Sequence, residues 1–177
     1  KDTNLLMVGK QMVQIDGLVT NATIPMERLV ARLDVYMFKS RRLENNTVIL
    51  KSIELVNQIT NTRGEYQNTI MVSPVETQND LRTISSNNVL GVMPDDMSGI
   101  IPDNATESFY SYQNIAASAD PDPNVTPYLL ITADIDGVSH RYKGYITDSG
   151  QTTDKYSLKR NTVYRIIAML DNPDNLL

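Results

Sequence analysis

The sequence predicts an all-β fold, an antiparallel β-sandwich of about seven strands with one long irregular excursion. Three observations support this prediction. Apolar and polar residues alternate with period 2 in several runs, as in strands that bury one face. Turn dipeptides rich in Gly, Asn and Asp separate these runs. Clear helical periodicity is rare along the 177 residues.

Composition limits the class of protein. Hydrophobic residues make up 41% of the chain and charged residues 21%, which is typical of a globular domain. No run of about 18 apolar residues is present, so no transmembrane segment is predicted. The net charge of −5 argues against nucleic acid as a partner, because phosphate binding needs an excess of clustered Lys and Arg. The absence of cysteine excludes disulfides and thiolate chemistry.

Residues 1–25 are predicted to be a lead segment, and residues 26–177 the sandwich domain. The lead begins Lys-Asp-Thr-Asn without an initiator Met or an apolar leader, as expected of a processed product. It contains one weak strand, Gln11–Ile15, followed by a turn at Asp16-Gly17.

Glu27–Phe38 is the first strong strand. Apolar residues occupy alternate positions, which predicts a buried face. A helix is the competing interpretation, because Leu, Ala, Arg and Met favour helices. The regular alternation favours the strand. Its buried face is predicted to consist of Leu29, Ala31, Leu33, Val35 and Met37.

Thr47–Val56 is the second strong strand, and it is apolar on both predicted faces. Apolar residues on both sides indicate a central position in a sheet. Tyr66–Val72 follows as a shorter strand. The predicted faces of Thr47–Val56 are Ile49, Ile53 and Leu55 on one side, and Val48, Leu50 and Val56 on the other.

Ser73–Asp103 is the long irregular excursion, because Pro and Gly interrupt it and no periodicity persists. A short helix is expected around Glu76–Ile84. The next strand, Ser108–Gln113, is expected to turn Phe109 toward the core and its tyrosines away from it.

The last unit is a hairpin followed by one long strand. Tyr128–Ile135 alternates cleanly, with Leu129, Ile131, Ala133 and Ile135 predicted on the buried face. Asp136-Gly137 supplies the positive φ angles of a tight turn. The chain returns through Ser139–Thr147, and Tyr156–Leu170 is predicted to be the final strand.

No catalytic constellation is found in the sequence. His140 is the single histidine and lies in a predicted hairpin strand, so a surface histidine is favoured over a member of a triad. The eight glycines are dispersed and form no phosphate-binding loop. No enzyme activity, cofactor or metal is therefore predicted.

Carboxylates form three pairs, Asp95-Asp96, Asp120 with Asp122, and Asp134 with Asp136. A glycosidase would need two such groups in one cleft, and this remains a weaker alternative. Residues 120–124 also resemble a calcium loop, yet they lack the spacing of an EF-hand, and alternating prolines stiffen a loop more simply. Nine tyrosines suit a sugar or protein contact surface, but packing on half-buried strands is the favoured interpretation.

Five segments carry distinctive motifs in a fixed order: Arg28–Val35, Ile53–Asn57, Phe109–Asn114, Tyr128–Thr132 and Leu158–Arg165. The more distinctive elements are Phe109…Asn114 and Arg160-Asn161…Tyr164. Each motif alone is weak, and their order along the chain supplies the specificity. In this order the segments resemble the fimbrillins, the major and minor pilus subunits of Bacteroidales.

The resemblance implies a transthyretin-like sandwich, export as a lipoprotein, proteolytic trimming, and a fimbrium attached to the outer membrane at the cell surface. Residues 1–25 would then be the tail of a preceding pilin domain. Subunits of the family assemble by donor-strand exchange, in which a strand of one subunit completes the sheet of the next. Such strand addition satisfies the unpaired backbone groups of an open edge. The implied partners are other pilin subunits, and the implied role includes support of adhesion.

The resulting hypothesis is a structural pilus subunit. Its assembly groove is expected between the strands in Glu27–Phe38 and Tyr156–Leu170. The alternative is a tip adhesin that binds a host glycan or protein through Ser73–Asp103 and the tyrosines. The predicted groove residues are Leu33, Val35, Met37, Tyr164, Ile166 and Ala168.

Overall fold

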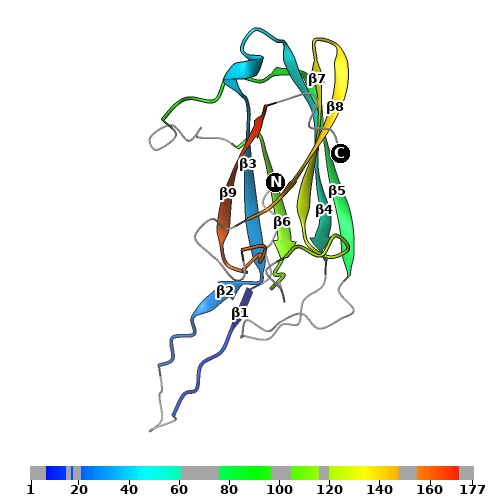
Figure 1. Cartoon of the computed structure of the whole chain (residues 1–177). Helices are drawn as coiled ribbons and strands as arrows, with labels where there is room; N and C mark the ends of the chain where they lie inside the picture. The colour runs from blue at the N-terminus through cyan, green and yellow to red at the C-terminus, as the bar shows by residue number, and fades with distance from the viewer. Residues whose placement is uncertain are drawn as a thin grey trace.

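The structure is a computed structural model that describes residues 7–14, 17, 21–60, 76–96, 105–115, 120–147 and 155–171, without the side chains of 85–87. Two β-sheets face each other and enclose the core (Figure 1). This arrangement confirms the all-β sandwich. In the described ranges, no helix is long and apolar enough to cross a membrane.

One layer is a three-stranded sheet with the order β6-β3-β9. Its strands are β6 (Glu107–Tyr112), β3 (Val30–Lys39) and β9 (Val163–Leu170). β3 pairs antiparallel with β6 and parallel with β9. The predicted antiparallel sandwich therefore contains one parallel pair, β3–β9.

The segment before β9 explains this parallel pairing. Leu158 and Asn114 exchange backbone hydrogen bonds of 2.8 and 2.9 Å. Asn161 then adopts a positive φ of 56°, and its N–H donates to the carbonyl of Val30 at 3.0 Å. The chain thus starts β9 beside the start of β3. The predicted strand Tyr156–Leu170 is correspondingly shorter and begins at Val163.

The second layer is a four-stranded antiparallel sheet with the order β5-β4-β7-β8. Its strands are β4 (Val48–Ile59), β5 (Thr77–Val89), β7 (Tyr128–Ile135) and β8 (Val138–Tyr145). The predicted central position of β4 is confirmed.

β5 lies where the sequence predicted an irregular excursion with a helix at Glu76–Ile84. Both expectations are wrong for residues 77–89, which form a strand. The reason is its edge position. Most of its described side chains are exposed, and only Ile84 among them packs against the core as a half-buried apolar residue. Backbone pairing with β4 holds the strand, so its hydrophobic pattern is weak.

β4 contains a bulge that overturns the predicted division of its faces. Its register with both neighbours shifts between Leu50 and Ser52. The extra residue, Lys51, reverses the alternation. Val48 and Leu50 therefore point to the same core as Ile53 and Leu55.

The core consists mainly of the inward side chains of β3, β4, β6 and β7. The predicted buried faces of β3 and β7 are confirmed, as is the inward orientation of Phe109. Residues with at most 1% of their surface exposed include Ala31, Leu33, Val35, Val48, Leu50, Ile53, Leu55, Phe109, Ala133 and Leu158.

The β7–β8 hairpin has the predicted two-residue turn. Asp136 and Gly137 have φ angles of 50° and 85°, as a type I′ turn requires. The Asp136 carboxylate accepts hydrogen bonds from the Asn46 amide at 2.6 Å and from the Thr47 N–H at 2.8 Å. These bonds lower the pKa of Asp136 and tie the turn to the start of β4.

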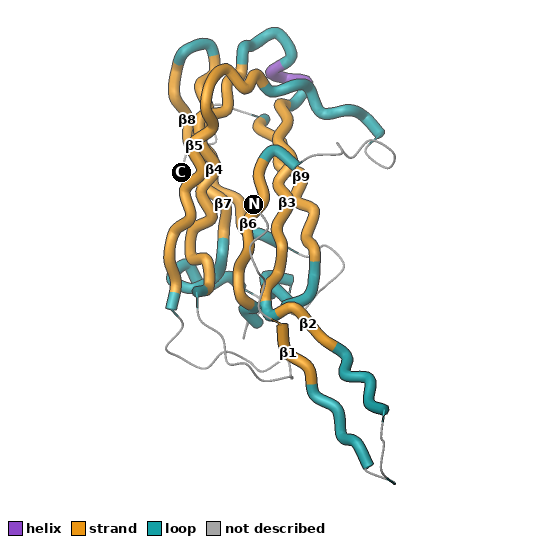
Figure 2. The backbone as a smooth tube through the Cα atoms, turned by 180° about the vertical axis from the view of Figure 1, so that it is seen from behind, coloured by secondary structure: helices purple, strands orange, loops and turns teal. Residues whose placement is uncertain are grey.

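A small antiparallel pair, β1 (Met7–Gly9) and β2 (Met26–Arg28), projects from one end of the sandwich (Figure 2). The predicted strand Gln11–Ile15 is wrong over residues 11–14, which form no strand. A short 3-10 helix, η1 (Arg41–Leu43), follows β3. The predicted strand Tyr66–Val72 lies outside the described residues.

Phe109→Ala should destabilise the domain by about 3–5 kcal/mol, because removal of the buried ring leaves a cavity between the two sheets. Tyr110→Ala is the matched control, since Tyr110 is half-buried on the outer face of the same strand. Its cost should be less than half as large. Urea unfolding followed by circular dichroism measures both. Equal losses would contradict the assigned orientation of β6.

Candidate functional site

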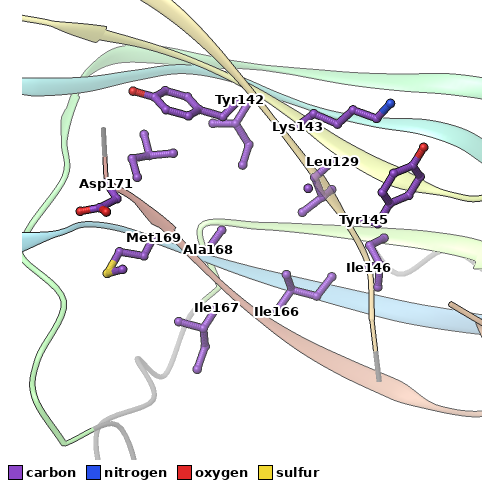
Figure 3. A pocket seen from close by; sticks show the side chains of 13 residues that line it. Leu129, Tyr142, Lys143, Tyr145, Ile146, Ile166, Ile167, Ala168, Met169 and Asp171 are labelled. Atoms are coloured by element: carbon purple, nitrogen blue, oxygen red, sulfur yellow. The ribbon is translucent and has the colours of Figure 1, made fainter. Parts of the chain in front are cut away.

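The candidate site is a groove of about 360 Å³ on the side of the sandwich where the edge strands β8 and β9 face each other (Figure 3). Its volume lies at the lower end of the range of roughly 300–1,000 Å³ found for ligand sites. Its lining is mostly apolar and comes from both sheets: Leu129, Ile131, Tyr142, Lys143, Gly144, Tyr145, Ile146, Ile166, Ile167, Ala168, Met169, Leu170 and Asp171.

β9 forms one wall of this groove and carries apolar residues on both faces, with Arg165 as its one charged residue. Ile166 and Ala168 are half-buried and point toward the core. On the other face, Val163, Ile167 and Met169 are 57%, 42% and 45% exposed. Apolar residues on both faces are typical of a central strand. β9 nevertheless lies at the edge of its sheet.

The hydrogen bonds between β9 and β3 determine which residues of β9 direct their backbone N–H and C=O groups toward β3. Arg32 N–H donates to the carbonyl of Thr162 at 2.9 Å, and Ser40 N–H donates to that of Leu170 at 2.8 Å. In a parallel pair, alternate residues direct both backbone groups toward the same neighbour. The even-numbered residues of β9 therefore face β3. The odd-numbered ones, such as Ile167, direct their N–H and C=O groups to the open edge.

β8 forms the opposite wall and, unlike β9, carries two charged residues on its outer face. Register with β7 places Arg141 and Lys143 on the outer face of the sheet and Tyr142 and Gly144 on the inner face. Charged residues on an edge strand disfavour pairing with a further strand. Gly144 has no side chain to fill the groove, and a Cβ there would meet nothing within 4 Å.

The opposite side of the sandwich is closed. Gln58 of β4 donates from its side-chain amide to the carbonyl of Tyr110 in β6 at 2.6 Å. The N–H of Ile59 donates to Ser111 Oγ at 3.0 Å. These bonds join the two sheets along β4 and β6. The groove between β8 and β9 is thus on the open side of the sandwich.

Two polar atoms on the inner face of β8 have no hydrogen-bond partner among the described residues. They are the Tyr142 hydroxyl and His140 Nδ1, and both atoms are buried. Burial raises the pKa of Tyr142. His140 lies opposite Ala133 and is half-buried, so the expectation of a surface histidine is wrong.

The structure divides the six predicted groove residues into three groups. Ile166 and Ala168 line the groove. Tyr164 is half-buried beside the core, and its hydroxyl accepts the Lys159 N–H at 2.8 Å. Three residues lie on the central strand β3, are buried in the core, and are not among the lining residues: Leu33, Val35 and Met37.

The groove residues that sequence reasoning missed come from β7 and β8. Leu129 and Ile131 were correctly predicted to point inward, but the sequence does not show which edges of the two sheets meet. The inward orientation of Tyr142 could have been predicted from the sequence. This residue lies opposite Ile131 in a hairpin whose two-residue turn fixes the register.

Carboxylates from two of the three predicted pairs are held in structural contacts. Asp134 forms an ion pair with Lys51 at 3.0 Å, and this contact lowers its pKa. A general acid needs a raised pKa instead. Asp122 accepts the N–H of Asn124 at 2.9 Å, which shapes the 120–124 loop as a local turn. Across the described ranges, no group of three His, Cys, Asp or Glu is placed to hold a metal ion.

Tyr142→Phe should raise the free energy of unfolding by about 1 kcal/mol, because it removes a buried hydroxyl that has no partner. Tyr145→Phe is the control, since its side chain points to the outer face of the same strand and should change little. Guanidinium unfolding of both variants tests this. A loss of stability in Tyr142→Phe would show that the hydroxyl has a partner.

Comparison of the sequence with models of protein families gives no match, and comparison with curated proteins gives none. Among solved structures, the crystal structure of a "putative cell adhesion protein" from Parabacteroides distasonis is similar, with a TM-score of 0.60 and 15% sequence identity. The similarity covers 87% of this chain and 46% of that chain, so this chain spans about half the length of the protein it matches. At this identity the likeness shows a shared fold, an all-β sandwich.

Proposed function

We propose that the chain is a structural subunit of a cell-surface fimbria in which subunits polymerise by strand addition. One observation carries the proposal. β9 carries apolar residues on both faces, with Arg165 as its one charged residue, yet among the described residues its outer edge has no strand partner and borders an apolar groove. A long, apolar edge strand is a template for pairing with another chain.

Strand addition along β9 would give its open backbone groups hydrogen-bond partners and would cover the apolar groove beside it. The backbone groups of Val163, Arg165, Ile167 and Met169 would gain ladder partners. Alternate side chains of the added strand would enter the groove beside Ile166 and cover its apolar lining. β8 is the less suitable edge, because it carries two charged residues, Arg141 and Lys143, whereas β9 carries one, Arg165.

The occupant is an extended segment of another subunit with apolar residues at alternate positions. A hydrogen-bonding side chain near the middle of such a segment would also reach the Tyr142 hydroxyl, whose burial without a partner costs about 1–3 kcal/mol in the unoccupied groove. Such a subunit needs no catalytic group or cofactor.

The solved neighbour supports the location and the domain organisation that we propose. That protein is named a cell adhesion protein. A role in adhesion fits our proposal of a fimbrium that is attached to the outer membrane at the cell surface. The greater length of that protein fits a two-domain subunit. Residues 26–177 would be one sandwich domain, and residues 1–25 the tail of a preceding pilin domain.

Ile167→Pro tests the proposal at the backbone. Proline removes an N–H that points to the open edge and is not used in pairing with β3. In the complete protein, expressed in the organism that produces it, this variant should abolish fibres in negative-stain electron microscopy. Ile167→Thr is the matched control, because it keeps the N–H and a β-branched side chain, and it should still polymerise. Normal fibres from a folded Ile167→Pro variant would refute strand addition at β9.

Amide hydrogen exchange provides a second test on the unmodified protein. The N–H groups of Val163, Arg165, Ile167 and Met169 should exchange rapidly in the isolated subunit, because they face the open edge. In assembled fibres their exchange should be strongly slowed. The Ile166 and Ala168 amides, which face β3, should be protected in both states. Equal exchange at the odd-numbered positions in subunit and fibre would contradict the proposal.

The alternative role, a tip adhesin of the same fimbria, is favoured by a feature at the rim of the groove. Tyrosines and lysines gather on the outer face of the four-stranded sheet, around Tyr128 and Tyr145.

A further inference from the structure

Three tyrosines and two lysines form a continuous patch, here named the tyrosine–lysine surface. It consists of Tyr128 on β7, Lys143 and Tyr145 on β8, and Lys155 and Tyr156 in the segment that follows. The ring centroids of Tyr128 and Tyr145 are 5.6 Å apart, and those of Tyr145 and Tyr156 are 5.9 Å apart. All five side chains are half-buried, so each keeps part of its surface open to solvent.

The hairpin explains how this surface forms. Its two-residue turn sets Tyr128 directly opposite Tyr145, and Leu130 opposite Lys143. Lys143 Nζ then lies 4.3 Å from the ring centroid of Tyr128 and 4.9 Å from that of Tyr145. Figure 3 shows Lys143 and Tyr145 extending away from Ile166 and Ala168, so the surface lies on the outer side of the sheet at the rim of the groove.

The charge of this surface is opposite to that of the whole chain, which has a net charge of −5. Within the described part of the chain, neither Lys143 nor Lys155 forms an ion pair with a carboxylate. Glu54 is separated from Lys143 by Leu130, which lies between them in the sheet. A local positive charge beside three aromatic rings therefore remains available to a ligand.

We propose that the tyrosine–lysine surface binds acidic saccharides. Tyrosine rings offer apolar faces for the C–H face of a sugar, and their hydroxyls can hydrogen-bond the sugar hydroxyls. The ammonium of Lys143 can pair with a carboxylate or sulfate of the ligand. Contact with two rings holds this ammonium in place before binding, which lowers the entropy lost on ordering the side chain.

An acidic peptide fits this surface less well. Extended peptides bind mainly through backbone hydrogen bonds to an open sheet edge. Tyr128 and Leu130 of β7 lie between β4 and β8, so their backbone is already paired on both sides. β8 is an edge strand, but the side chains of Lys143 and Tyr145 stand on the outer face of the sheet and not along its open edge. The surface offers side-chain faces instead, which suits a ring-shaped ligand. This inference does not depend on polymerisation at β9.

Isothermal titration calorimetry of the purified chain tests the proposal with defined probes. A hyaluronan hexasaccharide supplies carboxylates, a heparin-derived hexasaccharide supplies sulfates, and chitohexaose is the neutral comparison. Binding of either acidic probe, with chitohexaose bound at least about tenfold more weakly, is the expected result. The acidic probe that binds more tightly, carboxylated or sulfated, then shows which anionic group the surface prefers.

Variants then locate the site. Lys143→Gln and Tyr156→Ser should each weaken binding of the acidic probe about tenfold or more, because one removes the charge and the other a ring. Tyr110→Ser is the matched control, since Tyr110 lies on the outer face of the other sheet, and it should bind normally. Circular dichroism confirms that each variant is folded.

Three results would overturn the proposal. These are binding of neither acidic hexasaccharide, binding unchanged in both Lys143→Gln and Tyr156→Ser, and equal binding of a poly-glutamate peptide. The last result would show attraction between charges without recognition of sugar. Fibre formation is measured separately, so failure of this inference is distinguishable from failure of strand addition at β9.

Discussion

The parallel pairing of β9 with β3 is the constraint on which the candidate site depends. It commits one half of the β9 backbone to β3 and directs the other half to the open side. Of the odd-numbered side chains, Val163, Ile167 and Met169 are apolar and Arg165 is charged. Among the described residues, the exposed edge therefore lacks both hydrogen-bond partners and cover for its apolar side chains. The turn at Asn161 sets this arrangement, because it places the start of β9 beside Val30. The groove is thus a consequence of how the chain enters its last described strand.

The fold was predictable where burial imposes a simple pattern. Tyr128–Ile135 buries every second residue, and its strand bounds, its inward face and the turn at Asp136-Gly137 were all correct. Prediction failed where the backbone departs from that pattern or where burial is slight. The bulge at Lys51 reversed the faces of β4 without a local signal, since Lys is compatible with either face. β5 is held by backbone pairing at an edge, so its side chains give little alternation to read.

The groove was predictable only in part, for a different reason. Alternation shows which side chains point inward, and it correctly brought Ile166 and Ala168 to one face. It does not show which strands lie at the edges, and Leu33 and Val35 were included although β3 is central. The pair of Tyr128 and Tyr145 could have been derived from the two-residue turn, because that turn fixes the hairpin register. The contact of Tyr145 with Tyr156 depends on a return of the chain after β8, which no local pattern encodes.

β8 separates the two proposed activities because its faces differ. Its inner face borders the groove, while Lys143 and Tyr145 on its outer face belong to the tyrosine–lysine surface. The charges along β8 disfavour strand addition there and direct it to β9, so polymerisation would leave the outer face open. In a fibre, each subunit would then present one saccharide site at a regular interval. Binding of a polymeric glycan through several such sites can exceed the affinity of one site by about 10²–10⁴. If both proposals hold, a weak, half-exposed site on each subunit would therefore be sufficient for firm attachment by an assembled fibre.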